Sequence, residues 1–381
     1  MNTLAIDEYL ARAAASALRG EAMPMWPDDL RGCEAAAVHR IAFHGIALLL
    51  ANSPAARTRW PGTLGQAIRE QAGVQAFWEQ SHRPVIARLI EGLAAAGIRA
   101  IVTKGTALAY SVYDEPSLRR RGDTDIYIPA TSRQQARKVL RACGFRLWGD
   151  TKAFQEDWVA DTALGFASAV DVHWRINASG AVSKALEAGL RFDQTIALDR
   201  LAPHALGLGP VDNLILIAIN RSAHGQFGYN VGANRLFETD RLIWALDAHL
   251  LATAFSADDW DSLTERSART GTGAMVQGIL ALATQVFGTT VPTTTATALR
   301  EAPTDHGLAA YYGATSHLWR LRCDMAACTS LSEKARVLRY AVFPSSDFLQ
   351  TRYPDAQHWP RPALHVRRLF EGAGKLLTGR I

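Results

Sequence analysis

The chain has 381 residues, of which 48% are hydrophobic and 20% charged, as expected for a soluble globular protein with one large core or several subdomains. The net charge of +5 suits a polyanionic ligand, but so small an excess does not by itself indicate nucleic-acid binding. The longest apolar run, residues 41–51, is too short to cross a bilayer, and the N-terminus lacks the cationic run of a signal peptide. Because the four cysteines are scattered and none has zinc-finger spacing, we expect a cytoplasmic protein with reduced thiols and no membrane partner.

Residues 1–97 have the apolar periodicity of helices and form the first predicted region. The longest segment, residues 64–96, carries an apolar stripe that Pro84 interrupts. Proline removes a backbone hydrogen bond and clashes with the preceding turn, so we expect either a kink or two helices there. The Ala96-Gly97 pair predicts the end of the helical region.

Residues 98–182 form the second predicted region, in which strands and helices alternate. Residues 102–128 indicate a short strand, a tight turn, a helix, an arginine-rich loop and a second strand. A helix is predicted over residues 133–142, a strand from Phe145, and a hairpin from residues 154–159 and 164–176. This order predicts an α+β fold, with a mixed sheet and helices packed on one of its faces.

Residues 183–381 read as a mainly helical third region. Pro210 opens a predicted helix with Asp212 in its first turn. Residues 289–297 are rich in threonine and are interpreted as a polar loop, and the later helices are expected to break at residues 343–346 and 353–354. We expect this region to bind the substrate, although it contains no motif that we can decode.

Three aspartates are the strongest candidates for a functional site. Asp123 and Asp125 are two apart on a predicted strand, so their carboxylates share one face while Thr124 faces away. Two adjacent anions repel each other, and a divalent cation between them removes that cost. Asp171 lies on a later predicted strand, and three carboxylates on adjacent strands can hold two Mg²⁺ or Mn²⁺ ions for phosphoryl chemistry.

At these residues the sequence resembles a known family. Lys-Gly-Thr-Ala-Leu at residues 104–108, Arg119 four residues before Asp123-x-Asp125, and Asp-Val-His-Trp at residues 171–174 are similar to the uncharacterised bacterial nucleotidyltransferases of the DNA polymerase β superfamily. The turn here is Lys-Gly-Thr instead of the Gly-Gly or Gly-Ser of that pattern. The resemblance implies a polymerase-β-like core flanked by helical regions, with a nucleoside triphosphate as donor.

The resemblance also assigns roles around the aspartates. Gly105 and Thr106 open a helix whose backbone N–H groups suit a triphosphate, with the Thr106 hydroxyl in place of the usual serine. Lys104 would neutralise phosphate, and Arg119 would hold the leaving pyrophosphate. His173 shares a strand face with Asp171 and would orient the acceptor, contact phosphate or act as a base.

Each of these residues also has a structural interpretation that the sequence leaves open. The glycine turn fits an ordinary strand-to-helix connection, Lys104 a surface lysine, and His173 a packing residue. Arg120 and Arg121 continue the arginine run as a solvated loop, which the neighbouring Asp114 and Glu115 would pair with.

Aromatic and histidine side chains near the motif have two readings as well. Tyr110, Tyr113 and Trp174 would stack on a base or pack in the core. His224, in the helical third region, would line the cleft or serve a structural role.

The sequence thus predicts transfer of a nucleotidyl group from a nucleoside triphosphate to a hydroxyl, with release of pyrophosphate and Asp171 as proton acceptor. A small molecule, a peptide or a protein is the expected acceptor, and nucleic acid is the weaker candidate because no basic stretch is interleaved with aromatics. Two alternatives stay open. One is a tailoring enzyme acting on a ribosomally made peptide of the lasso type, and the other is an inactive nucleotide-binding protein.

Overall fold

The structure is a computed structural model. It describes residues 3–53, 60–149, 151, 154–177, 179–231, 234–238, 240–344, 349, 352–356 and 358–377. The second half of the break expected at residues 343–346 lies outside these described residues.

In the described part of the segment before the sheet, the α-helices are α1 (Thr3–Leu18), α2 (Glu34–His44), α3 (Ala47–Asn52) and α4 (Gly62–Ala95). Helix α4 continues through Pro84, so the expectation of two separate helices is wrong. Its apolar stripe is buried on both sides of the proline, from Leu64 and Ile68 to Ile86 and Leu89. Burying several such side chains outweighs the ~3 kcal/mol that proline costs inside a helix.

A seven-stranded mixed sheet forms the centre of the structure. Its strands are β1 (Ile101–Thr103), β2 (Asp123–Tyr127), β3 (Arg146–Trp148), β4 (Gln155–Asp161), β5 (Ala167–His173), β6 (Thr195–Ala197) and β7 (Leu206–Leu208). Their order across the sheet is β3-β4-β5-β2-β1-β7-β6. The hairpin predicted in the second region is confirmed, because β4 and β5 pair antiparallel.

The register of the central strands positions the predicted acidic residues. Strand β2 pairs antiparallel with β1 and parallel with β5, and Asp125 lies directly opposite both Thr103 and Asp171. Parallel pairing requires a crossover between β2 and β5, which is supplied by α6 (Arg133–Ala142), β3 and β4. Residues far apart in the sequence are thereby brought to one face of the sheet.

Two strands come from the segment that was predicted to be helical. Strand β7 pairs parallel with β1, and β6 pairs antiparallel with β7, so the sheet extends beyond the predicted boundary at residue 182. Each strand has only three residues, which is too short for an alternating pattern to stand out from helical periodicity. The division into three regions stays a prediction.

Helices make up most of the rest of the chain, together with a small hairpin of β8 (Tyr229–Val231) and β9 (Asn234–Leu236). They are α5 (Lys104–Ser111) after β1, then α7 (Gly180–Gly189), α8 (Pro210–Phe227), α9 (Leu242–Ala254), α10 (Ala257–Thr270), α11 (Gly273–Phe287), α12 (Thr293–Arg300), α13 (Gly307–Gly313), α14 (His317–Ala327), α15 (Leu331–Val342) and α17 (Arg361–Leu377). Helix α12 occupies most of the stretch interpreted as a threonine-rich loop, which corrects that prediction. Buried Thr295 and Leu299 anchor it.

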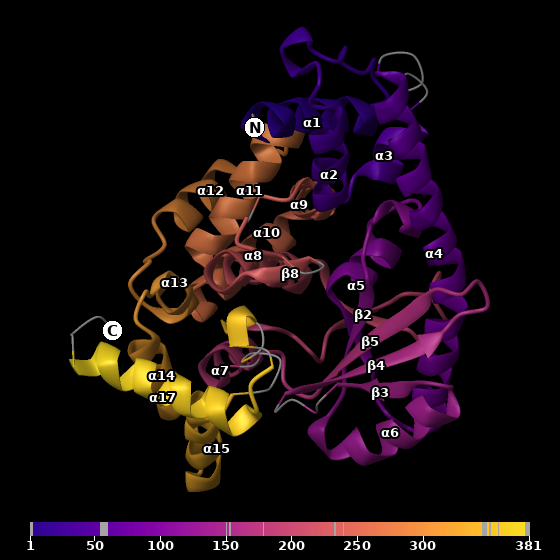
Figure 1. The fold of residues 1–381 in the computed structure, drawn as a ribbon. Helices are drawn as coiled ribbons and strands as arrows, with labels where there is room; N and C mark the ends of the chain where they lie inside the picture. The colour runs from indigo at the N-terminus through magenta and orange to yellow at the C-terminus, as the bar shows by residue number, and fades with distance from the viewer. Residues whose placement is uncertain are drawn as a thin grey trace.

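Two large hydrophobic cores hold the molecule together. One lies between the sheet, α4, α5 and α6, and the other joins the N-terminal helices to α8, α9 and α11. Figure 1 accordingly shows α1, in indigo, beside α11, although more than 250 residues separate them in the sequence. In the part of the chain that the structure describes, no helix combines the length and apolar character that a bilayer crossing requires.

Candidate active site

The turn between β1 and α5 carries an unusual backbone conformation at Lys104. Its φ of +53° lies in the left-handed region, which residues other than glycine seldom adopt, and such outliers concentrate at functional sites. The turn brings the Lys104 ammonium group into a hydrogen-bonded ion pair with Asp125. Burial acts to lower the pKa of Lys104, but the three carboxylates of Asp125, Asp123 and Asp171 outweigh it and raise that pKa. The lysine therefore stays protonated beside the acidic residues.

Asp125, Asp171 and His173 converge at the centre of the sheet. Each offers one ligand atom, and these atoms all lie within 4.8 Å of one another. His173 Nε2 is 3.0 Å from Asp125 Oδ1. Asp123 shares the face of Asp125 at the exposed end of β2, while Thr124 between them is fully buried on the opposite face. A group of this composition has the ligands that a divalent cation uses.

The carboxylates perturb one another strongly. Burial raises the pKa of Asp171 to about 7, and the charges of Asp125 and Asp123 add to the rise. Burial and Asp125 likewise raise the pKa of Asp123 to about 6, although Lys104 and two arginines oppose the rise. Burial acts in the same direction on Asp125, but Lys104 and His173 outweigh it and hold its pKa below the usual range. The group formed by Asp123, Asp125, Asp171, Lys104 and His173 is called the acidic face here. It therefore carries more negative charge than its cations neutralise.

Strand β4 contributes two neighbours of Asp171 that were not predicted from the sequence. Asp157 lies opposite Asp171 in the register, and its charge contributes to the raised pKa of Asp171. Gln155 Nε2 donates hydrogen bonds to Asp157 Oδ1 at 2.6 Å and to Asp171 Oδ2 at 2.9 Å. The sequence shows that Gln155 and Asp157 are two residues apart and share a strand face. It does not show the register between β4 and β5 that places them beside Asp171.

The same residues lie inside a region of family-level similarity. The sequence profile of a family described as an uncharacterised nucleotidyltransferase matches residues 34–288, well over half of the chain. The chain belongs to this nucleotidyltransferase family. No match is found among curated proteins. The matched region runs from the start of α2 to the end of α11 and includes every residue of the acidic face.

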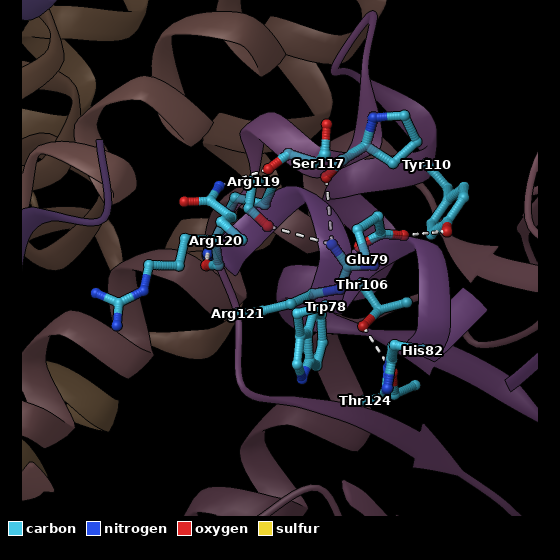
Figure 2. A network of polar contacts seen from close by, with 12 residues as sticks. Trp78, Glu79, His82, Thr106, Tyr110, Ser117, Arg119, Arg120, Arg121 and Thr124 are labelled. Atoms are coloured by element: carbon cyan, nitrogen blue, oxygen red, sulfur yellow. Dashed lines mark hydrogen bonds and ion pairs between the residues drawn. The ribbon is translucent and has the colours of Figure 1, made fainter. Parts of the chain in front are cut away.

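A hydrogen-bond network lies on the rear face of β2 in this nucleotidyltransferase, and Figure 2 shows its residues Thr124, His82 and Thr106. Thr124 Oγ1 lies 2.8 Å from His82 Nε2 and 2.9 Å from Thr106 Oγ1, and His82 Nδ1 lies 2.7 Å from Ser168 Oγ. Thr106 is only 1% exposed. Its hydroxyl therefore supports β2 from behind, and its predicted contact with a phosphate stays a prediction.

The three arginines before β2 are each engaged with the protein. Arg119 donates through Nε to both carboxylate oxygens of Asp247, at 2.7 and 2.9 Å, and Asp247 is fully buried. Arg121 forms a buried ion pair with Glu79 on α4. Arg120 donates to the backbone carbonyl of Ala42.

These contacts correct one prediction and leave another untested. Arg119 binds Asp247 through Nε, and its role as a clamp for pyrophosphate stays a prediction. The partners of Arg119 and Arg121 are distant residues and not the neighbouring Asp114 and Glu115. Arg119 and Arg121 therefore join the core to α9 and α4 and are not solvated, whereas Arg120 is exposed.

The aromatic candidates are mainly structural. Tyr110 donates to Glu79, and Tyr113 OH lies 2.7 Å from Asp247 Oδ1, so both hydroxyls belong to the buried ion pairs. The Arg133 guanidinium lies 4.0 Å from the centre of the Trp174 ring. Burial lowers the pKa of His224 to about 4, and its ring stacks on Tyr229 at 4.6 Å. These contacts explain the positions of the rings within the protein, and a role in stacking on a base stays a prediction.

A cavity of ≈ 530 Å³ adjoins the acidic face. Lys104 and His173 line it at the sheet, and α7, α8, α13 and α14 supply lining residues from the helical part of the chain. Figure 1 shows α7 and α8 beside the sheet, on the side away from α4. Gln155, which hydrogen-bonds Asp171, also lines the cavity. Lys104 and His173 of the acidic face, together with Gln155 beside it, therefore connect the cavity to the aspartates.

Proposed function

We propose that the protein is a metal-dependent nucleotidyltransferase with a polymerase-β-like core, which moves a nucleotidyl group from a nucleoside triphosphate to a hydroxyl acceptor. One observation carries the proposal: Asp125 and Asp171 lie side by side on parallel strands. His173 lies beside them, and Lys104 forms an ion pair with Asp125. Family membership supports nucleotidyl transfer in general, and the acidic face supports a metal-dependent form of it.

The residues of the acidic face fit a divalent cation. The raised pKa values of Asp123 and Asp171 show that their ionised forms lack compensation, and a hard cation such as Mg²⁺ or Mn²⁺ supplies it through oxygen ligands. Asp123, Asp125 and Asp171 would hold the metal, with His173 beside them. When bound, the ion lowers the pKa of a hydroxyl and stabilises charge that develops on the phosphates.

The residues of the α5 turn are proposed to receive the triphosphate. Backbone N–H groups at the start of α5, including that of Gly105, favour an anion. The side chain of Lys104 is 41% exposed, so its ammonium group can reach a phosphate as well as Asp125. Arg119 and Thr106 are left out of this assignment because their polar groups are bound inside the protein.

The proposed transfer exchanges one bond to phosphorus for another. The acceptor oxygen forms a bond to the α-phosphorus, the bond from that phosphorus to its bridging oxygen breaks, and pyrophosphate leaves. The hydroxyl proton passes to Asp171, which we select for its position. Both Gln155, its hydrogen-bond donor, and His173, two residues further along β5, line the cavity that adjoins the site.

The substitution Asp123→Asn tests this proposal. We expect pyrophosphate release from ATP and Mg²⁺ in the presence of alcohols to fall by about 10³-fold or more, because a charged ligand is lost where transition-state charge develops. Binding of Mn²⁺ with ATP, measured by calorimetry, should weaken in parallel. The matched control is Asp161→Asn, an exposed carboxylate on the same sheet, which should change neither quantity. Wild-type activity in the Asp123 variant would refute the proposal.

A further inference from the structure

The cavity beside the acidic face has the size of a small-molecule site. Its volume of ≈ 530 Å³ falls within the 300–1,000 Å³ range of pockets that enclose drug-sized ligands. It lies between the sheet and the helices α7, α8, α13 and α14. Since α13 and α14 follow residue 288, part of its wall lies outside the region that matches the family. The wall is therefore a place where this chain can differ in specificity.

The wall of the cavity is mainly aromatic and aliphatic. Six aromatic residues line it: Tyr127, Phe154, Phe192, Phe227, Tyr311 and Tyr312. Several of these rings pack against one another, with centroids 5.0 Å apart for Tyr127 and Phe192 and 5.9 Å apart for Phe227 and Tyr312. Such packing keeps the rings in place before a ligand enters, and a preformed apolar wall favours an apolar occupant.

The charged groups of the cavity are already paired. Among the described residues that line it, Lys104 carries the one lysine or arginine side chain and Asp324 the one carboxyl group. Lys104 pairs with Asp125. Asp324 accepts hydrogen bonds from Ser179, from the backbone N–H of Ala181 and from the Tyr311 hydroxyl. A triphosphate needs more cations than the described lining residues supply, and a charged amine would find the carboxylate of Asp324 occupied.

Polar groups at the sheet end of the cavity complete the pattern. His173 and Lys104 mark the end that adjoins Asp125, and Asn220 of α8 also lines the cavity. The Asn220 amide forms no hydrogen bond with another described residue, so it can bind a polar group of an occupant. A ligand with an apolar body and one polar end matches this arrangement.

We propose that the cavity binds the acceptor, and that the acceptor is an uncharged small molecule with an aromatic or bulky apolar body and a hydroxyl at the Lys104–His173 end. The proposal rests on the transfer reaction proposed above, for which it names the acceptor class. The proposal rules out a nucleic acid or an extended peptide as the acceptor, since neither fits within an apolar cavity of this volume.

Binding of 2-naphthol tests the acceptor class without any chemistry. The metal-free and nucleotide-free protein is titrated calorimetrically with 2-naphthol and with glucose, which has hydroxyls but no apolar body. We expect 2-naphthol to bind and glucose not to. Equal binding of the two, or no binding of 2-naphthol, would overturn the proposal.

Substitutions on α8 locate the binding. Ala223 lines the cavity, so Ala223→Trp should fill it and weaken 2-naphthol binding at least about tenfold, and Ala223→Leu should weaken it less. The matched control is Ser222→Trp, because Ser222 is the next residue on the helix and lines a separate cavity. Binding of ATP and Mn²⁺ to all three variants shows that they are folded. Wild-type affinity for 2-naphthol in both Ala223 variants would overturn the proposal.

Competition separates the acceptor from the nucleoside as occupant. A non-hydrolysable ATP analogue with Mg²⁺ should leave the affinity for 2-naphthol unchanged or increase it, whereas mutually exclusive binding would place the nucleoside in the cavity and overturn the proposal. Pyrophosphate release from ATP should then rise with 2-naphthol and not with naphthalene, which lacks the hydroxyl.

Two further outcomes distinguish failure of the proposed transfer reaction from failure of the proposed acceptor class. If 2-naphthol binds as expected but no alcohol releases pyrophosphate, the transfer reaction is refuted and with it the acceptor role. If glucose releases pyrophosphate while 2-naphthol neither binds nor reacts, the acceptor class is refuted and the transfer reaction stands.

Discussion

The two faces of β2 are built on opposite principles. The front face carries Asp123 and Asp125 beside Asp171, and two of these three carboxyl groups have pKa values raised by burial and mutual repulsion. The rear face carries Thr124, whose hydroxyl lies within hydrogen-bond distance of both His82 and Thr106 (Figure 2). One strand thus separates uncompensated charge from polar groups that are paired with one another.

The difference between the faces teaches where to look for function. A buried polar group is normally paired, so the rear network is explained by stability alone. Adjacent unpaired carboxylates reduce stability unless a ligand compensates them, and such perturbed groups concentrate at functional sites. The comparison predicts that changes behind β2 lower stability and spare ligand binding, whereas changes in front do the reverse.

The largest effect on stability is expected behind the strand, at Glu79. Its carboxylate pairs with Arg121, and both side chains are at least 90% buried. The substitution Glu79→Gln keeps the shape but leaves the arginine charge uncompensated, which typically costs about 3–5 kcal/mol. Chemical denaturation measures this as a lower free energy of unfolding.

A double variant provides the control for that prediction. Replacing both partners, with Glu79→Leu and Arg121→Met, removes the buried charges together and should recover most of the lost stability. The affinity of the folded double variant for ATP with Mn²⁺ should stay close to that of the wild type. A large loss of affinity would mean that the Glu79–Arg121 pair behind β2 takes part in ligand binding, which contradicts the comparison.

The front face was the part most accessible from the sequence, because its signals are local. Asp123 and Asp125 show their shared face through strand alternation, and the glycine turn at Gly105 is visible in the segment that precedes them. The hairpin of β4 and β5 also follows from short-range pattern. Membership of the nucleotidyltransferase family agrees with the function that these signals indicated.

Contacts between residues that lie far apart in the chain could not be predicted from the sequence. Arg119 was predicted to hold pyrophosphate, but its partner Asp247 lies 128 positions away and no local pattern links the two. Asp157 depends on the register between two strands, which a shift of one residue would reverse. The cavity needs helices that are brought together only by tertiary packing. Each of these features is a property of the assembled fold.

A smaller effect of opposite sign is expected in front of the strand, at Asp171. Its folded pKa of about 7 exceeds the unfolded value of about 3.9, so the folded protein binds the extra proton between these pH values. Stability therefore falls as pH rises from about 4 to about 7, and the full cost is present above pH 7. In the presence of a chelator, Asp171→Asn should raise the melting temperature at pH 8 by about 2 °C or more.

The pH dependence supplies the check on that prediction. At pH 4.5 the wild-type carboxyl group is already protonated, so the difference between Asp171→Asn and wild type should shrink. Asp161→Asn, at the exposed end of β4, should lie within about 0.5 kcal/mol of wild type at both pH values. A variant that is destabilised at pH 8 would show that the front face is compensated within the protein, and the contrast between the two faces would be lost.

The smallest expected effect decides between the sequence-based role of Thr106 and its place in the structure. Its hydroxyl lies 2.9 Å from that of Thr124 and donates to the Asp123 carbonyl at 3.3 Å, behind the strand. Thr106→Val keeps the shape and removes these bonds, while Thr124 retains His82, so we expect a loss of about 1 kcal/mol in stability. The affinity for ATP with Mn²⁺ should not change. If the hydroxyl contacted a phosphate, the affinity would fall several-fold, as we expect for Lys104→Met in front of the strand.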